Sequence, residues 1–582
     1  MEPFLIPLPS RMRPDDVAYL KSRGALAIPN TKLRNALLRS YFTHIHPFMP
    51  VIDMDEFLRA IESDGRYHRI SFLLFQAVMF AGAACIPMCY LEKLGFNSRK
   101  EAREDLFARV RLLYDFDYET DRLALVQSLL LMTLWYKSPE EHRNTWHWLD
   151  VAVSQAFAIG LHVESDKAIS SRRQCSLRRK IWWSCYVTDR LISLHMKRPP
   201  RIRGDDFHVA VLQESDFQAK LPSQDRHVLL QAMCPYVSDT ELRSTLGRLF
   251  IELAGLCQLM DPMLRLHRSA RLDENKILPF GDRGMTNSPN PSLDSIQKLS
   301  VLKTRLTEWM DSLQKACSYK ASTSTEFASV IYLHQTILCL TFQAMMLNTY
   351  RSTKIISQEQ SDYIEAEEAK SDMVGAAKQI SNLAGEVLEK GLCNFLPAST
   401  LGGIVHAAAI FLQRAEYQEQ AEKEDSEERL MQCLEVITLM EEIYEPARMA
   451  KEAISWALLR PWHLRELSNI DITQAEDILV HHSETPYSKR EYSSPDNCTG
   501  RDAETNTPST ATSLWSSDLD HREELGPVLK AWGFIAKEEP MIANVDAEIH
   551  GLSMISMEGL GVLNDLTLSM EFRKLSSDIC SQ

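Results

Sequence analysis

The stretch "RRKIWWSCYVTDRLISLHMKRPPRI", residues 178–202, combines two tryptophans, an Asp-Arg pair and a double proline. At helical spacing its bulky side chains form two adjacent strips that cover more than half of the helix surface. We therefore expect a helix at the centre of a core. The sequence predicts that this helix is entered through Ser176 as an N-cap and ends at Pro199-Pro200, because neither proline can donate a helical hydrogen bond. The two strips are Ile181, Cys185 and Thr188, and Trp182, Tyr186 and Asp189.

Asp189 and Arg190 are the charged pair within this helix. Neighbouring residues on a helix project about 100° apart, so we expect each side chain to pair with another helix rather than with its neighbour. A charge placed in a core needs a partner. The pattern thus favours a structural pair that fixes packing over a catalytic pair.

The rest of the chain also has the composition of an all-α protein. Only 21 of 582 residues are glycine, while helix-forming residues recur over long stretches. The sequence predicts a large multi-helix domain rather than a sheet-based fold. Apolar periodicity and helix-breaking residues predict helices over residues 31–45, 70–91, 101–114, 121–136, 144–159, 241–267, 299–313, 330–350, 366–388, 400–419 and 428–459.

Composition divides the chain into five regions. Residues 1–30 are rich in proline and predict an extended arm. Residues 31–270 form the main helical domain, and residues 271–470 continue it. Residues 471–525 are a Ser/Thr-rich linker that cannot offset chain entropy by burial, so we expect disorder there. Residues 526–582 form an acidic-hydrophobic tail, without a Lys or Arg between Glu538 and Glu571.

Net charge and cysteine usage indicate which partners and which cellular compartment the sequence favours. The formal charge of −15 repels a phosphate backbone. The 12 cysteines form no C-x-x-C pair and no secretory leader is recognised at the start, so we expect a reducing intracellular compartment. Residues 70–91 are long and apolar enough for a membrane span, but Gln76 and Pro87 favour a helix buried in the bundle, and no membrane contact is expected.

Several stretches together resemble the middle regulatory region of the fungal zinc binuclear cluster (Zn2Cys6) transcription factors, most of all the cutinase transcription factor group. The residues that carry the resemblance to the family's most recognisable block are Trp182, Trp183, Asp189, Arg190, Arg198, Pro199 and Pro200. The resembling stretches occur in family order and are "HPFMPVIDMDEF" at 46–57, "LYDFDYETDRLALVQSLLLMTLWY" at 113–136, "TWHWLDVAVSQAFAIGLH" at 145–162, residues 178–202, and "DDF" at 205–207.

The resemblance implies an all-α regulatory domain in a nuclear transcription regulator, with control of a biosynthetic gene set, as in secondary metabolism, as the expected role. It also implies a zinc cluster of six cysteines before this region, yet no cysteine precedes Cys85. Cys85 and Cys89 are expected to share a helix face and to pack in the core. We therefore expect no cofactor, no metal and no catalytic residue in this chain.

Three explanations remain open for DNA recognition. The chain acts with a DNA-bound partner regulator, a zinc cluster is encoded upstream of Met1, or the chain titrates a partner and represses. As an activator it would recruit the transcriptional machinery through the tail, with Leu560, Leu563 and Leu566 as the candidate contacts. A small hydrophobic effector is a further expected partner, since large helical bundles often hold a cavity.

Two alternatives belong to other classes. A non-DNA-binding accessory protein that senses a ligand would share the same helices. An all-α enzyme is the remote alternative, because "NDLTLSMEF" at 564–572 has a metal triad's residue types at the wrong spacing. The isolated histidines His142, His147 and His162 also lack metal-binding spacing. The basic run at residues 172–180 is interpreted as a solvated helix start rather than an import signal or phosphate contact.

Overall fold

In a computed structural model the chain folds as a set of packed helices. The structure describes residues 2–138, 141–164, 171–196, 198–218, 239–274, 291–316, 325–359, 363–417 and 420–459. Within these ranges there is no β-strand, only two isolated bridges that join Leu5 to Ile70 and Val163 to His208. The predicted all-α fold class is confirmed. The linker and the tail, including Leu560, Leu563 and Leu566, lie outside the described residues.

The first helices are short and begin where the sequence supplies a capping side chain. The side chains of six residues each accept a hydrogen bond from a backbone N–H of the first turn: Asn30, Asp53, Ser71, Ser98, Asp121 and Asn144. These caps start α2, α3, α4, α6, α7 and α8. The elements run α1 Pro14–Ser22, α2 Thr31–Ser40, the π-helix η1 Tyr41–Ile45, α3 Met54–Glu62, α4 Phe72–Gly82, α5 Met88–Glu92, α6 Arg99–Asp115, α7 Arg122–Met132 and α8 Thr145–Ala158.

Residues 178–196 of the quoted stretch belong to the long helix α9, Arg172–Met196, which is buried along most of its length. The predicted N-cap at Ser176 is wrong, because the helix starts four residues earlier. The Ser171 hydroxyl accepts a hydrogen bond from the Gln174 backbone N–H at 3.2 Å, and Ser176 Oγ instead donates to the carbonyl of Asp216 at 3.1 Å. The end of the helix before Pro199-Pro200 is as predicted.

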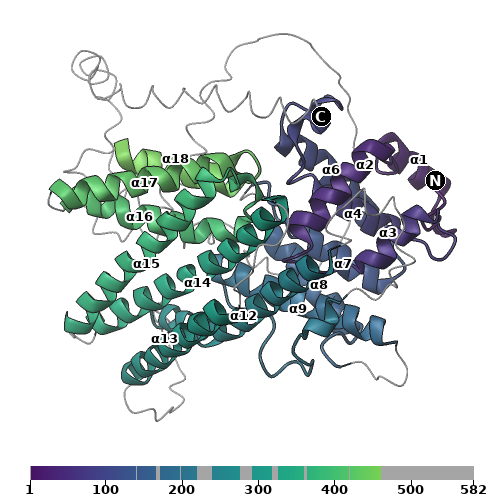
Figure 1. Cartoon of the computed structure of the whole chain (residues 1–582). Helices are drawn as coiled ribbons and strands as arrows, with labels where there is room; N and C mark the ends of the chain where they lie inside the picture. Colours follow the sequence, from purple (N-terminus) through teal and green to yellow (C-terminus); the bar gives the residue numbers. More distant parts are fainter. Residues whose placement is uncertain are drawn as a thin grey trace, which may run out of the picture.

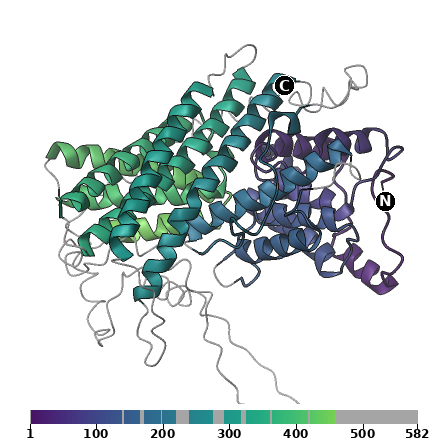
Figure 2. The same cartoon turned by 90° about the horizontal axis from the view of Figure 1, so that it is seen from below.

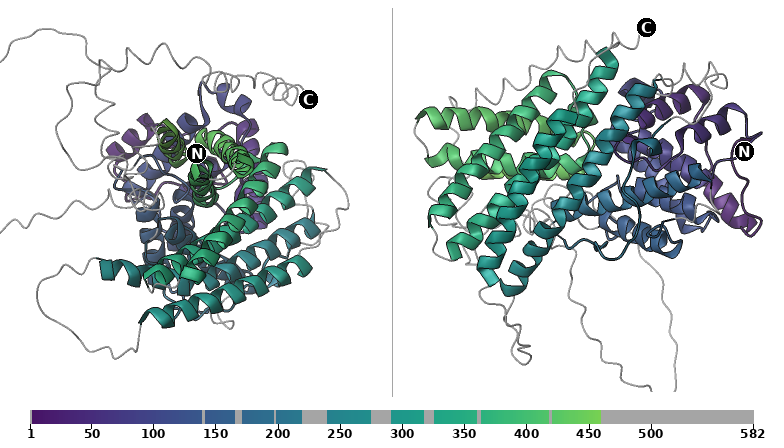
Figure 3. Two further views of the ribbon diagram at one scale, coloured as in Figure 1. Left: turned by 90° about the vertical axis from the view of Figure 1, so that its left-hand side faces the viewer. Right: turned by 60° about the horizontal axis from the view of Figure 1, so that its bottom comes forward.

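The later helices are longer and form the other side of the molecule. In Figures 1 and 2, α12, α13, α14 and α15 run side by side, with α16 to α18 beyond them and the N-terminal helices on the opposite side. Figure 3 shows the same division from two further directions. The elements are the short helix η2 Glu214–Asp216, α12 Thr240–Glu274, α13 Pro291–Ala316, α14 Thr325–Glu359, α15 Tyr363–Glu389, η4 Cys393–Phe395, η5 Ala398–Thr400, α16 Leu401–Tyr417, α17 Gln420–Glu441 and α18 Glu445–Leu459.

Two hydrophobic cores hold these elements. The first runs from the N-terminal helices through α9 and α12 into α13 and part of α14. The second is built from α14 to α18. Tyr350, Phe395 and Tyr444 pack against both cores. The two cores therefore meet around these rings.

Residues 1–30 do not form the extended arm that proline content predicted. They contain α1, and the side chains of Phe4, Leu5 and Leu20 are buried in the first core. A backbone N–H of Ile70 donates to the carbonyl of Phe4 at 2.8 Å. The prolines did not prevent packing, because Pro14 occupies the first position of α1, where no intrahelical donor is needed.

Two predicted helices are each broken in two. Residues 70–91 form α4 and α5 with a turn between them, and Pro87 caps the second helix. Residues 428–459 form parts of α17 and α18, with a break before Pro446. In both places a proline inside the apolar pattern starts a new helix, because its ring fits the first turn and not the interior.

One helical segment among the described residues, Ala328–Lys354 within α14, is long and apolar enough to cross a membrane. Of its most apolar window, 78% is buried inside the molecule. Its apolar surface thus belongs to the contact between the two cores.

Candidate functional site

The tryptophans of α9 surround one inserted ring. Phe207, from the loop after the helix, lies 5.4 Å from Trp182 and 6.0 Å from Trp183 between ring centroids, and 5.5 Å from Tyr186. Trp183 Nε1 donates to the carbonyl of Ala210 at 2.9 Å. The returning loop is thereby fixed to α9, since tilted aromatic contacts add to the free energy of burial.

Asp189 and Arg190 are fully buried and contact one another, with Arg190 Nη1 donating to Asp189 Oδ2 at 2.6 Å. The expectation that each side chain pairs with another helix rather than with its neighbour is wrong on the second point, because the Arg190 guanidinium reaches the Asp189 carboxylate. The expectation of further partners is correct. Arg190 Nε donates to Asp261 of α12 at 2.6 Å, and Asp189 accepts from the backbone N–H groups of Arg201 and Ile202 at 3.0 and 3.1 Å. The pair joins α9, α12 and the loop that follows α9.

The rest of the block shapes that loop. The guanidinium of Arg198 lies 5.1 Å and that of Arg201 lies 3.5 Å from the centre of the Trp146 ring. Pro199 is exposed and Pro200 is half-buried. The described hydrogen bonds of Trp183, Asp189 and Arg190 to other elements join α9 to α12 and to the loop that follows α9.

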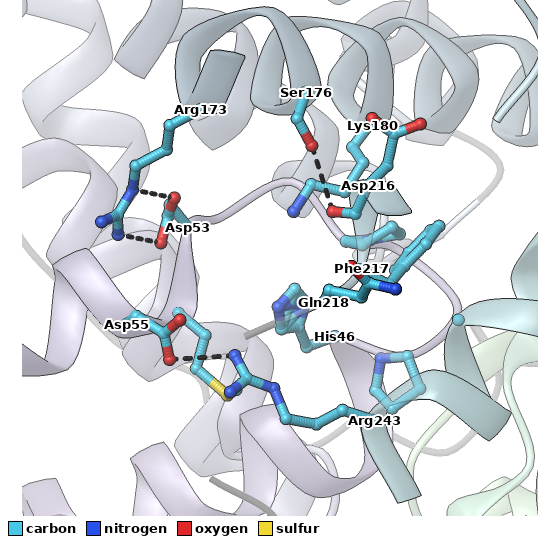
Figure 4. A pocket seen from close by; sticks show the side chains of 14 residues that line it. His46, Asp53, Asp55, Arg173, Ser176, Lys180, Asp216, Phe217, Gln218 and Arg243 are labelled. Atoms are coloured by element: carbon cyan, nitrogen blue, oxygen red, sulfur yellow. Dashed lines mark hydrogen bonds and ion pairs between the residues drawn. The ribbon is translucent and has the colours of Figure 1, made fainter. Parts of the chain in front are cut away.

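A small polar pocket lies where the start of α9 meets the start of α3 (Figure 4). Arg173 donates to both carboxylate oxygens of Asp53, the N-cap of α3, and Arg243 of α12 donates to Asp55 at 2.9 Å. The structure thus brings together two stretches of the resemblance, residues 46–57 and 178–202, at the walls of this pocket. Arg179 adds an ion pair to Asp216 at 2.9 Å.

Charged side chains in and around the polar pocket form ion pairs with one another. The Arg173 guanidinium and the neighbouring Lys180 hold the pKa of Asp53 below its ordinary value against the effect of burial. Burial lowers the pKa of His46 to about 3, so this imidazole is neutral at neutral pH. The basic run of residues 172–180 is therefore not a merely solvated helix start. Its arginines Arg173 and Arg179 connect α9 to the start of α3 and to η2.

A larger and mainly apolar cavity, which we term the junction cavity, lies where the two hydrophobic cores meet. Its volume is about 230 Å³. One wall is the last part of α9, with Leu191 and Ile192, and the opposite wall is built by η4, η5, α16 and α18. Phe395 and Tyr444, which pack against both cores, line it. Sequence reasoning expected a cavity for a hydrophobic effector but named none of these residues.

The described residues hold no group of three or more His, Cys, Asp or Glu side chains arranged to bind a metal ion. Cys85 lies in the turn after α4 and Cys89 in α5, so the two do not share one helix as expected. Cys85 is buried, and burial raises the pKa of its thiol to about 11. Such a thiol is an apolar packing group, as the sequence predicted for it.

Comparison with known proteins agrees with the resemblance seen in the sequence. Residues 38–311 match the model of the fungal specific transcription factor domain. The matched region begins in α2 and ends in α13, and it contains α9 with the whole Trp-Trp to Pro-Pro block. The matched residues thus carry the fungal specific transcription factor domain, in agreement with the resemblance.

Three individual relatives are similar to this chain over different lengths. It is 35% identical over 466 residues to cutinase transcription factor 1 beta of Fusarium vanettenii, which covers 78% of this chain and 52% of that protein. It is 27% identical over 446 residues to transcription factor cpaR of Aspergillus oryzae, 74% of this chain and 72% of that one. It is 22% identical over 181 residues to the fusaric acid cluster transcription factor FUB12 of Gibberella moniliformis, 31% of this chain and 26% of that one. The chain spans about half the length of the cutinase transcription factor.

Proposed function

We propose that the protein regulates transcription in the nucleus, with the described helices as its regulatory domain. The observation that carries this proposal is the match of residues 38–311 to the fungal specific transcription factor domain, with its buried α9 block at the centre of the fold. The Arg190–Asp261 ion pair of that block joins α9 to α12. A domain of this kind acts through its shape and its partners rather than through a catalytic group.

The formal net charge of −15 does not favour a phosphate backbone. We propose that the chain reaches DNA through a DNA-bound partner regulator or through an upstream zinc cluster, and that residues 526–582 recruit the transcriptional machinery. The relative named for the fusaric acid cluster supports a biosynthetic gene set as the target.

Deletion of the gene in its own organism tests the proposal. A defined set of transcripts should change, and the full chain should restore them while a fluorescent tag places it in the nucleus. An enzyme would instead change a metabolite before any transcript. Unchanged transcripts in the deletion strain, or a protein held outside the nucleus under all conditions, would overturn the proposal.

A second function, ligand sensing, is favoured by the junction cavity. Its walls come from both hydrophobic cores, so occupancy would alter how the two cores pack on each other. A ligand shifts a conformational equilibrium only by its differential affinity for the two states. A cavity at the contact between two cores provides that difference. This function is compatible with a regulator and with an accessory protein that modulates one.

A further inference from the structure

Arg103 of α6 is the unusual member of the junction cavity's wall. It is only 1% exposed and is one of the largest fully buried side chains of the described residues. Its Nη1 donates to the carbonyl of Ile443 at 2.8 Å, and its Nη2 donates to the carbonyl of Leu134 at 2.7 Å. The guanidinium therefore connects the first half of the chain to the turn before α18.

The charge of Arg103 has no carboxylate partner among the described residues. Its remaining neighbours are the rings of Phe80, Trp135 and Tyr444, with centroids 5.4 to 5.6 Å from the guanidinium carbon. Its Nε is buried without a hydrogen-bond acceptor. An isolated buried cation is costly, and five N–H donors are more than two carbonyls can satisfy.

The rest of the cavity wall is apolar in character. Leu191, Ile192, Val405 and Ala450 are among the side chains that line it. Such a surface binds hydrocarbon, while a guanidinium binds a carboxylate with two parallel hydrogen bonds. The two requirements are met together by a molecule with an anionic head and an apolar body.

We propose that the junction cavity binds a monocarboxylic acid with a hydrocarbon body, whose carboxylate lies at Arg103. The ligand contacts α6 and α9 on one side and η5, α16 and α18 on the other, so its binding strengthens the contact between the two cores. As a means of regulation this inference rests on the proposed function, but the binding itself does not.

Binding to the purified full chain is measured by isothermal titration with two acids and their uncharged analogues, decanoate against decanol and naphthoate against naphthylmethanol. At least one acid should bind, at least about 10-fold more tightly than its alcohol, which is the usual contribution of a charge-assisted hydrogen bond. If neither acid binds, or if the alcohols bind as tightly as the acids, the proposal is wrong.

Two variants locate the site. Arg103→Met should abolish the preference for the acid, whereas Arg99→Met should keep it. Arg99 is the matched control, because it is also buried in α6 and also donates to two backbone carbonyls, those of Ala84 and Ile86, but does not line the cavity. Should Arg103→Met fail to fold, Ala450→Phe tests the same site by filling the cavity. Full acid binding by Ala450→Phe would overturn the assignment.

Amide hydrogen exchange provides a readout of where the ligand acts. The bound acid should slow exchange at residues 395–405 and 443–450, which contribute to the wall of the cavity opposite α9. Protection confined to distant helices would contradict the proposed site. Since neither measurement involves transcription, absence of binding and absence of a transcript response in the deletion strain remain separate outcomes.

Discussion

At the scale of single residues, Asp189 is the acceptor on which the loop after α9 depends. It receives hydrogen bonds from Arg190 and from two backbone N–H groups of that loop. Removal of one member of a buried ion pair leaves its partner charge unpaired, which typically costs about 3–5 kcal/mol. We expect Asp189→Ala to lower the free energy of unfolding by at least about 3 kcal/mol, measured by urea unfolding.

The matched control is Asp150→Ala. Asp150 also pairs with an arginine of the same loop, Arg201, at 2.6 Å, but its side chain is 66% exposed. Exposed ion pairs contribute about 0–1 kcal/mol, so this variant should unfold near the wild-type midpoint. If the two variants lose the same free energy of unfolding, the burial of Asp189 does not determine its contribution to stability.

Buried histidines should make the stability of the fold depend on pH. Burial lowers the pKa of His46 to about 3 and that of His334 to about 4. Both values lie below the ordinary value of about 6.5, so the neutral imidazole contributes stability above that pH, and this stability is lost as pH falls toward the folded-state values. Between pH 7 and pH 5 each histidine should lower the free energy of unfolding by about 2 kcal/mol.

Urea unfolding at the two pH values checks this expectation. The variant His46→Gln should lose about 2 kcal/mol less than the wild type between pH 7 and pH 5. His142→Gln is the control, because His142 is exposed, and it should keep the wild-type pH dependence. A pH dependence unaffected by His46→Gln would mean that this imidazole can be protonated in the folded protein.

At the scale of elements, Gly82 permits close contact between α4 and α2. A Cβ atom at this position would lie 2.3 Å from the carbonyl oxygen of Leu37, and the Gly82 carbonyl accepts a hydrogen bond from Ser40 Oγ at 2.7 Å. We expect Gly82→Ala to destabilise the protein by at least about 1–3 kcal/mol, because a backbone contact cannot yield as a side chain can. Thermal unfolding measures the shift.

At Gly375 of α15 the same change from glycine to alanine should have the opposite effect on stability. It is exposed, and a Cβ atom there meets nothing within 4 Å. Gly375→Ala should stabilise the protein by about 0.5–1 kcal/mol, as alanine does in an open helix interior. If both substitutions lower the melting temperature alike, the close contact of α4 with α2 is not what limits position 82.

Helix starts with strong capping residues were predictable from the sequence, and long-range contacts were not. The helix predicted over residues 144–159 is observed as α8, and Gly160 has the positive φ of 68° that its C-terminal position requires. Ser176 failed as a cap because Ser171 provides an earlier start. The junction cavity could not be predicted, since Arg103 meets Ile443 across 340 positions of sequence.

At the scale of the whole molecule, the described helices and the C-terminal tail differ in the sequence context of their apolar side chains. The described residues bury their apolar side chains in two cores, whereas the acidic-hydrophobic tail offers Leu560, Leu563 and Leu566 within a segment free of Lys and Arg. Apolar side chains interspersed with acids are typical of segments that bind transcriptional coactivators. Such a segment should act when moved to another protein.

A fusion of residues 526–582 to an unrelated DNA-binding domain should therefore activate a reporter gene. Replacement of Leu560, Leu563 and Leu566 by Ala should reduce activation severalfold, because the apolar side chains supply the contact and the acids mainly keep the segment solvated. The matched control replaces Ser553, Thr567 and Ser569 by Ala in the same segment and should leave activation unchanged. A silent wild-type fusion would assign recruitment to another part of the chain, and the two-core helical domain would then have to bind the transcriptional machinery itself.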